Sequence, residues 1–281
     1  MRAEQLTDPV AYHAECPVWS PSWGGLRLVD MLAGDVLSLD ADGTVERRSV
    51  GEIAAALRPR RDGGAVIAIE RGFLLEEPDG SLTGLGELWD DEQVRMNEGG
   101  CDPDGRFYCG SMAYQQTPGA GSLYRLEGDR SVAVVLRDVT ISNGLEWSPD
   151  GALAYYNDTA TGQISVFDYD SANGLSGRRV FVEIADGGSP DGLTVDAEGG
   201  VWTALFDRGE VHRYDYRGVL DEVVEVAARQ VTACTFGGDH LERLLITTSR
   251  EGLEPGEDPF AGSVFTAAVG VPGLPVRPFA G

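Results

Sequence analysis

The sequence predicts an all-β protein, a six-bladed β-propeller of four-stranded antiparallel blades. Three observations lead to it: strand-like runs fill the 281 residues, turn residues separate those runs at hairpin spacing, and one phrase recurs six times. All-β chains of this length often fold as one unit, so we expect a single propeller domain over residues 1–281.

Short runs rich in β-branched and aromatic residues predict the strands. Examples are LRLVDM, RFYCGSMA, ALAYYND and VWTALFD, and clusters of Gly, Asp and Pro separate them. The nearest approach to a helical period is the brief GEIAAALRPR. We therefore expect strands almost throughout the chain.

A recurring phrase sets a longer period: a hydrophobic landmark residue, a turn with Asp or Gly, and an apolar strand. Clear copies read WSPSWGGLRLVD, CDPDGRFYCGS, WSPDGALAYYN and VDAEGGVWTAL. The landmarks are spaced 40 to 48 residues apart and are Trp19, Pro59, Cys101, Trp147, Val195 and Phe236. Repeats of this length, each able to supply about four short strands, favour a propeller over a β-sandwich or a β-helix.

Four residues before each landmark lies an equivalent position, and five of the six carry a side-chain oxygen. If this stretch is the innermost strand of its blade, the equivalent positions form a ring around the propeller axis. These ring positions are Glu15, Ala55, Asn97, Asn143, Asp191 and Thr232. Two carboxylates and two amides meeting on the axis would be costly to desolvate without a cation.

The ring therefore predicts one divalent metal ion on the axis. Oxygen ligands suit Ca²⁺, Mg²⁺ or Mn²⁺ better than a thiolate-seeking metal, and they also permit Zn²⁺. Three or four protein oxygens leave positions open for water and substrate. The pairs Asn143-Gly144 and Asp191-Gly192 are also ordinary turn signals, but their shared offset across the repeats favours the ring.

Arg95 lies two residues before Asn97, so both side chains share one face of a strand. The chain has 22 arginines and no lysine. An arginine beside the ring is thus a candidate fork for ligand oxygens, with a surface or ion-pair role as the alternative.

Composition excludes several classes of function. Without lysine, Schiff-base and P-loop chemistry are impossible. A net charge of −24 argues against nucleic acid or an anionic membrane as partner. No apolar run could span a membrane, and the N-terminus lacks a signal peptide, so we expect a cytoplasmic protein. No obligate protein partner is indicated. Four cysteines without a CxxC pair predict free thiols.

Other motifs are weaker on inspection. DADG at 40–43 resembles the start of an EF-hand loop, but Ser49 stands where the bidentate Glu belongs, so we predict a hairpin turn. Ser189 lacks the glycine that a nucleophile elbow needs. The three histidines lie off the ring register and have no ligand spacing, which favours surface or core roles and argues against a serine–histidine triad.

Several long motifs resemble those of the regucalcin/gluconolactonase (senescence marker protein) family, along essentially the whole chain. They are AECPVW, RMNEGGCDPDGRFYCGSM, ISNGLEWSPDG, SPDGLTVDAEGGVW, CTFGG and SREGLEP…GSVF. The resemblance implies a six-bladed propeller with one axial divalent metal. The family's metal-binding residues fall on Glu15, Asn143 and Asp191, and Asp191 is also its catalytic acid/base. The residues that bind sugar-like ligands fall on Arg95 and Asn97.

The chain departs from the family pattern in two places. Ala14 replaces the glycine that usually precedes the first glutamate. The segment after Met112 is shorter than in animal members and has no counterpart of a substrate-contacting glutamate, so the resemblance specifies the chemistry but not the substrate.

The resulting hypothesis is a metal-dependent hydrolase that opens a small sugar aldonolactone, such as glucono-, xylono-, arabinono- or galactonolactone. Two alternatives stay open at this point. One is a hydrolase of organophosphates or of other esters or lactones on the same scaffold, and the other is a non-catalytic calcium-binding propeller. We also expect residues 1–13 to supply an outer strand to the blade that contains Ser263 to Val269.

Overall fold

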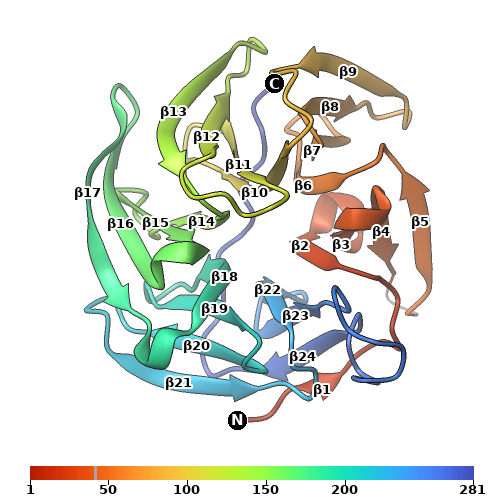
Figure 1. The fold of residues 1–281 in the computed structure, drawn as a ribbon, viewed down its shortest axis with the longest axis vertical. Coiled ribbons are helices and arrows are strands. Elements are labelled where there is room, and N and C mark those ends of the chain that lie inside the picture. Colours follow the sequence, from red (N-terminus) through yellow and green to blue (C-terminus); the bar gives the residue numbers. More distant parts are fainter. Residues whose placement is uncertain (41–42) are drawn as a thin grey trace.

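The computed structural model describes residues 1–40 and 43–281, and in these residues six four-stranded antiparallel sheets stand in a ring (Figure 1). The predicted all-β, six-bladed propeller is confirmed. From the innermost strand outward, the strands of blades 1 to 6, in that order, are β2 (Ala14–Ser20), β3 (Gly25–Asp30), β4 (Asp35–Leu39), β5 (Val45–Ser49); β6 (Ala54–Pro59), β7 (Ala65–Ile69), β8 (Gly72–Glu76), β9 (Leu82–Glu87); β10 (Val94–Cys101), β11 (Phe107–Ala113), β12 (Gly121–Leu126), β13 (Val132–Val139); β14 (Ser142–Trp147), β15 (Leu153–Asp158), β16 (Gln163–Asp170), β17 (Gly174–Glu183); β18 (Ser189–Val195), β19 (Val201–Phe206), β20 (Glu210–Tyr214), β21 (Leu220–Glu225); and β22 (Val231–Gly237), β23 (Arg243–Thr248), β24 (Val264–Ala268), β1 (Glu4–Gln5).

The innermost strands surround the axis and pack against one another around the ring. Each predicted landmark lies at or near the end of such a strand: β14 ends at Trp147 and β18 ends at Val195, for example. The repeat read from the sequence is therefore the blade itself. Between blades 3 and 4, the buried Trp147 packs edge-on against Tyr108 and Tyr169. Burying one such ring contributes about 2–3 kcal/mol.

In two of the blades the turn after the landmark has the pattern Asp-x-x-Gly, and its hydrogen bonds explain that pattern. In blade 3, Asp102 Oδ1 accepts hydrogen bonds from the backbone N–H groups of residues 104 and 106. The turn closes at Gly105, whose φ of 85° disfavours any residue with a Cβ. Asp196 and Gly199 repeat this arrangement in blade 5. The hairpin turn predicted at 40–43 includes residues 41–42, which lie outside the described residues.

The two ends of the chain close the ring and cover its axis. β1 pairs with β24, which confirms the predicted N-terminal outer strand. After β24 the chain crosses the propeller axis and ends beside blade 2, where Phe279 N–H donates to Pro59 O (Figure 1). Phe279 is fully buried.

Helical structure in the described residues is limited to the short 3₁₀ turns η1 (Pro21–Trp23), η2 (Met31–Ala33), η3 (Thr159–Thr161) and η4 (Ala185–Gly187). Among the described residues we find no helix with the length and apolar character needed to cross a membrane. All four cysteines are buried free thiols, as predicted.

Candidate active site

All six innermost strands break their pairing register at the ring position. The breaks lie between Glu15 and Val18, Ala54 and Ala56, Met96 and Gly99, Ser142 and Leu145, Pro190 and Leu193, and Val231 and Ala233. A β-bulge bends its strand and redirects the side chains at the break. The six ring positions predicted from the sequence therefore share one local geometry, and the bulge is its physical cause.

Three carboxylates meet on the axis. One oxygen each of Glu15, Glu98 and Asp191 lies within 4.8 Å of the others, and all three residues are at most 5% exposed. Among the described residues, Glu15 Oε2, Glu98 Oε2 and Asp191 Oδ1 have no hydrogen-bond partner. Buried acceptors without partners are uncommon in native proteins, and this set fits the oxygen ligands of a divalent cation.

Burial, together with neighbouring negative charge, raises the pKa of all three acids. Burial, followed by the charges of Asp191 and Glu98, holds the pKa of Glu15 well above its usual range. Burial and the charge of Glu98 do the same to the pKa of Asp191. Burial raises the pKa of Glu98 to about 7, although Arg58 lowers it in part. A bound cation would compensate these charges and restore the ionised forms.

Glu98 is the site residue that the sequence interpretation missed. It lies one position after Asn97, inside the bulge of β10. The residues one position after the other ring members are all small: Cys16, Ala56, Gly144, Gly192 and Ala233. A Cβ on Gly192 would collide with Ala233 and lie 3.1 Å from Glu98 Oε2. The sequence signal that could have identified Glu98 is that it is the one carboxylate at a repeat position where the other five residues are small.

The amides form a chain of hydrogen bonds beside the carboxylates. Arg95 Nη1 donates to Asn97 Oδ1 at 2.6 Å, and Asn97 Nδ2 donates to Asn143 Oδ1 at 2.9 Å. Asn143 Nδ2 in turn donates to Thr159 Oγ1 at 2.7 Å. Asn143 Oδ1 keeps a second lone pair for a further partner. The predicted neighbours Arg95 and Asn97 are thus joined directly.

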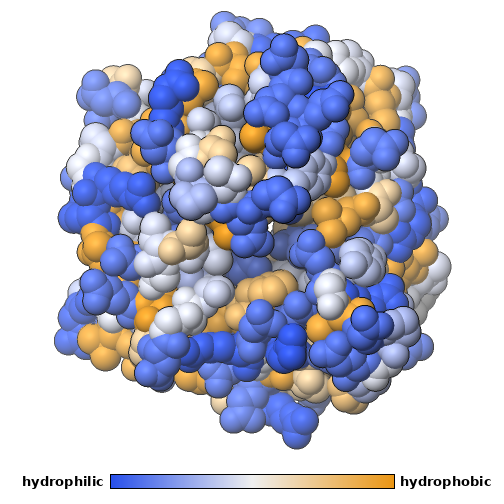
Figure 2. Space-filling view, in the orientation of Figure 1, coloured by the Kyte–Doolittle hydropathy of each residue, from blue (hydrophilic) through white to orange (hydrophobic). Residues whose placement is uncertain are grey.

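These residues open onto one pocket. It has a volume of about 750 Å³, and Glu15, Arg95, Asn97, Asn143 and Asp191 all line it. Figure 2 shows a hollow near the centre of the ring with hydrophilic residues at its rim. Glu98 does not line this pocket; it borders a small cavity further along the axis. The structure therefore brings all five predicted site residues together, and their roles stay predictions.

The other two ring positions do not contribute oxygen to this pocket. Ala55 has none, and the hydroxyl of Thr232 donates to Ala14 O at 2.6 Å. The hydroxyl of Thr232, the fifth oxygen-bearing side chain of the predicted ring, therefore has a backbone partner.

His13 is closer to the site than its sequence position indicated. It lines the pocket, with Nε2 3.5 Å from Glu15 Oε1 and Nδ1 2.6 Å from Ser249 Oγ. Burial and the charge of Arg95 lower the pKa of His13 to about 3, so the ring is neutral. His13 is buried, as one of the expected roles required, but it also contacts the ring residue Glu15, which its position outside the ring register did not indicate. His212 is buried and His240 is exposed, as expected.

The chain is similar to known proteins along most of its length. The family model described as "SMP-30/Gluconolactonase/LRE-like region" matches residues 13–250. The chain belongs to this family. A 6-deoxy-6-sulfogluconolactonase from Pseudomonas putida is 37% identical over 95% of this chain and 94% of its own length. Regucalcin from Danio rerio is 34% identical over the same shares.

A solved structure extends the family match to three dimensions. It is a regucalcin from Agrobacterium tumefaciens, described as a calcium-binding protein, with a TM-score of 0.92 and 29% sequence identity. The match covers 99% of this chain and 96% of that chain. The family resemblance inferred from AECPVW and the other motifs is therefore confirmed.

Proposed function

We propose that this chain is a divalent-metal-dependent hydrolase that opens a sugar aldonolactone to the aldonic acid. One observation carries the proposal: three buried carboxylates with unpartnered oxygens lie close together, and two of them, Glu15 and Asp191, line a pocket with Arg95, Asn97 and Asn143. Membership of the family, and a relative named as a lactonase, support a lactone as the substrate.

Glu15, Asn143 and Asp191 are the residues that would hold the ion, and Glu98, beside Glu15 and Asp191 but outside the pocket lining, would add negative charge. When bound, a divalent ion supplies Lewis acidity toward a carbonyl oxygen. The experiment described below distinguishes among Ca²⁺, Mg²⁺, Mn²⁺ and Zn²⁺ as the bound ion.

The side chains of the pocket supply orientation and proton transfer. Arg95 is buried, and its Nε has no partner among the described residues, so it can donate to a hydroxyl or carbonyl oxygen of the sugar. Asn97, fixed between Arg95 and Asn143, helps to orient the same hydroxyls. Asp191 takes the proton of the attacking water at a carboxylate oxygen and returns it to the ring oxygen as the lactone opens.

The test is a panel of lactones. Purified protein is treated with chelator and then resupplied separately with Ca²⁺, Mg²⁺, Mn²⁺ or Zn²⁺. Acid release from glucono-, xylono-, arabinono- and galactonolactone is followed in weak buffer. We expect hydrolysis of at least one lactone that chelator abolishes and one metal restores. Turnover unaffected by chelator would contradict the metal requirement. No turnover, together with a large chelator-induced fall in Tm, would favour a non-catalytic metal-binding propeller.

A further inference from the structure

The charges that line the pocket are unevenly balanced. Its lining includes the carboxylates of Glu15, Asp191, Asp207 and Glu251 and a single guanidinium, that of Arg95. A divalent ion would offset Glu15 and Asp191. Asp207 already has a partner, because Arg229 Nε lies 3.3 Å from its Oδ1. Glu251 and Arg95 are therefore the charges that a substrate would meet.

Glu251 is fixed at the rim of the pocket by the loop that joins β23 to β24. Its backbone N–H donates to Ser249 Oγ at 2.9 Å, and the bridge between Ser249 and His13 ties this loop to blade 1. The carboxylate lies 3.8 Å from His13 Nδ1. His13 Nδ1 is already engaged by Ser249 Oγ at 2.6 Å, so Glu251 makes no hydrogen bond to this ring.

The carboxylate of Glu251 is available to a ligand. Its side chain is 46% exposed, and among the described residues no group donates a hydrogen bond to its oxygens. It forms no ion pair with Arg95 within the described residues, yet its charge is the main favourable influence on that buried guanidinium, whose pKa burial lowers. The Glu251 carboxylate and the Arg95 guanidinium thus line the same pocket without forming an ion pair.

We infer that Glu251 determines specificity: its carboxylate accepts hydrogen bonds from the hydroxyls of an uncharged sugar lactone and repels lactones that carry a carboxylate, phosphate or sulfonate. This rests on the proposed function and names the substrate class of the same site. A carboxylate can only accept hydrogen bonds, and sugar hydroxyls can donate them. A second negative charge near Glu251 would be repelled across a partly desolvated pocket.

The expected specificity differs from that of one relative. The Pseudomonas putida relative is named for a sulfogluconolactone, whose sulfonate makes the sugar anionic. In this chain such a group would meet Glu251 while Arg95 Nη1 is already engaged with Asn97 Oδ1 and Met96 O.

The experiment compares two lactones that differ in one group. D-glucono-1,4-lactone carries CH₂OH at C6, and D-glucaro-1,4-lactone carries a carboxylate there. The ratio of their kcat/KM values is measured for the wild-type metal-loaded protein, for Glu251→Gln and for the control Glu254→Gln. Glu254 is an exposed glutamate of the same loop that does not line the pocket.

We expect the wild type to prefer the neutral lactone and Glu251→Gln to reduce that preference about tenfold, as loss of one nearby like charge requires. Glu254→Gln should leave the ratio unchanged. A wild-type protein that accepts both lactones equally, or an unchanged ratio in Glu251→Gln, would overturn the inference.

A binding measurement separates this inference from the proposed function. The corresponding neutral and anionic lactams, which resist hydrolysis, are titrated calorimetrically into the calcium-supplied protein and both variants. If neither lactone is hydrolysed, the proposed function fails, and the ratio of lactam affinities still decides the role of Glu251. Equal affinities for the two lactams in wild type and Glu251→Gln would refute it.

Discussion

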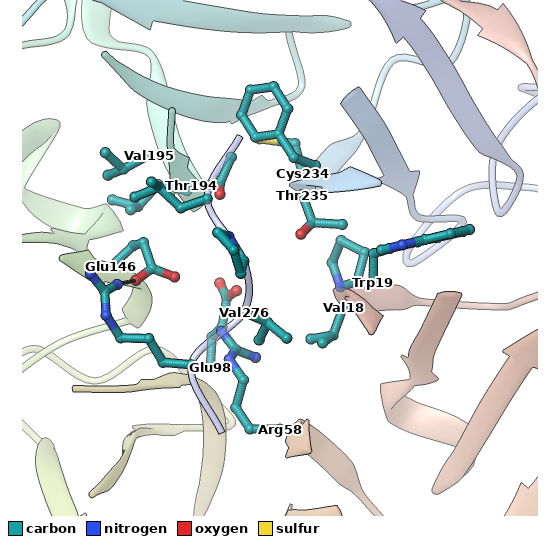
Figure 3. Close-up of a pocket in the computed structure, with 16 residues that line it drawn as sticks. Val18, Trp19, Arg58, Glu98, Glu146, Thr194, Val195, Cys234, Thr235 and Val276 are labelled. Carbon is teal, nitrogen blue, oxygen red and sulfur yellow. Dashed lines mark hydrogen bonds and ion pairs between the residues drawn. The ribbon is translucent and has the colours of Figure 1, made fainter. Parts of the chain in front are cut away.

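The two ends of the propeller axis both carry buried charged residues, but they differ in how those charges are compensated. We call an end complete where its charged groups have protein partners or an opposite charge nearby, and only one end is complete in this sense. At the end that the C-terminal segment covers, a cavity of about 30 Å³ is bordered by Arg58, Glu98, Glu146 and Arg277 (Figure 3). Arg277 Nη1 donates to Glu146 Oε1 at 2.8 Å. Arg58 Nη1 donates to Leu57 O and to Cys16 Sγ. Each charged group there has a protein partner or an opposite charge nearby.

At the pocket end, the two carboxylates nearest the axis, Glu15 and Asp191, lack such partners. Among the described residues, neither Glu15 nor Asp191 forms an ion pair with an arginine, and each has a buried oxygen without a hydrogen bond. Burying unpaired carboxylates is strongly unfavourable unless they are protonated or meet a cation. The comparison separates a polar cluster that stabilises the fold from one that requires a ligand, and Glu98 lies between the two.

The largest expected effect is at the incomplete end. Asp191→Asn removes the proton acceptor while keeping the side-chain shape, so we expect kcat to fall by about 10²–10⁴-fold. The measurement is initial-rate hydrolysis of the lactone selected from the panel, at saturating metal. The exposed Asp239→Asn provides the same chemical change away from the pocket and should retain activity. An Asp191→Asn enzyme within threefold of wild type would remove Asp191 from the mechanism.

Glu98→Gln tests the residue that joins the two ends. The pKa of Glu98 is raised from 4.5 to about 7 in the folded, metal-free protein. Between these two pH values the folded protein keeps the proton of this carboxyl, whereas the unfolded chain has lost it. Stability due to this carboxyl is therefore greatest at low pH and declines as pH rises through that window. In chelator, we expect Glu98→Gln and wild type to have similar stability at pH 5. At pH 8 the variant should be more stable by up to about 3 kcal/mol.

The readout is the free energy of unfolding at the two pH values, with Glu254→Gln as the control that should follow wild type. His13 is common to all three proteins, so its own titration cancels from the differences. With metal present the order should reverse, because Glu98→Gln removes negative charge from the site and weakens metal binding. A Glu98→Gln protein whose stability relative to wild type is the same at both pH values would contradict this account.

Much of this arrangement could be predicted from the sequence because the repeat is regular. Counting four residues back from Trp19, Trp147 and Val195 reaches Glu15, Asn143 and Asp191, and each innermost strand carries its bulge at that count. The rule succeeds because one local geometry recurs in every blade. Residues at equivalent positions of the repeat therefore occupy equivalent places around the axis.

The rest depends on features that the repeat does not encode. The bulge in β10 leaves two residues unpaired, so counting one position per blade found Asn97 and passed over Glu98. The pairing of Glu146 with Arg277 joins residues 131 positions apart and depends on the path of the C-terminal segment. No periodic signal marks such a contact.

A smaller effect is expected at His13. Ser249 Oγ already accepts from Glu251 N–H, so its own hydroxyl can donate to His13 Nδ1. The neutral ring then carries its proton on Nε2, which faces Glu15 Oε1. Groups that orient a metal ligand in this way typically change metal affinity by 10–100-fold. We expect His13→Phe to weaken metal affinity about tenfold in a competition titration with a chelating dye. Unchanged affinity would show that Glu15 is held by packing alone.

The smallest effect should come from the complete end of the axis. Arg277→Met leaves the partly exposed Glu146 without its partner, so we expect a loss of about 1 kcal/mol and a fall in Tm of about 2–4 °C. Metal affinity and kcat should not change. The double variant Arg277→Met/Glu146→Met should recover most of the lost stability, because an apolar pair can replace an ion pair without leaving a charge buried. If Arg277→Met instead altered metal affinity as much as His13→Phe, the two ends would be one coupled network, and the division drawn between them would be wrong.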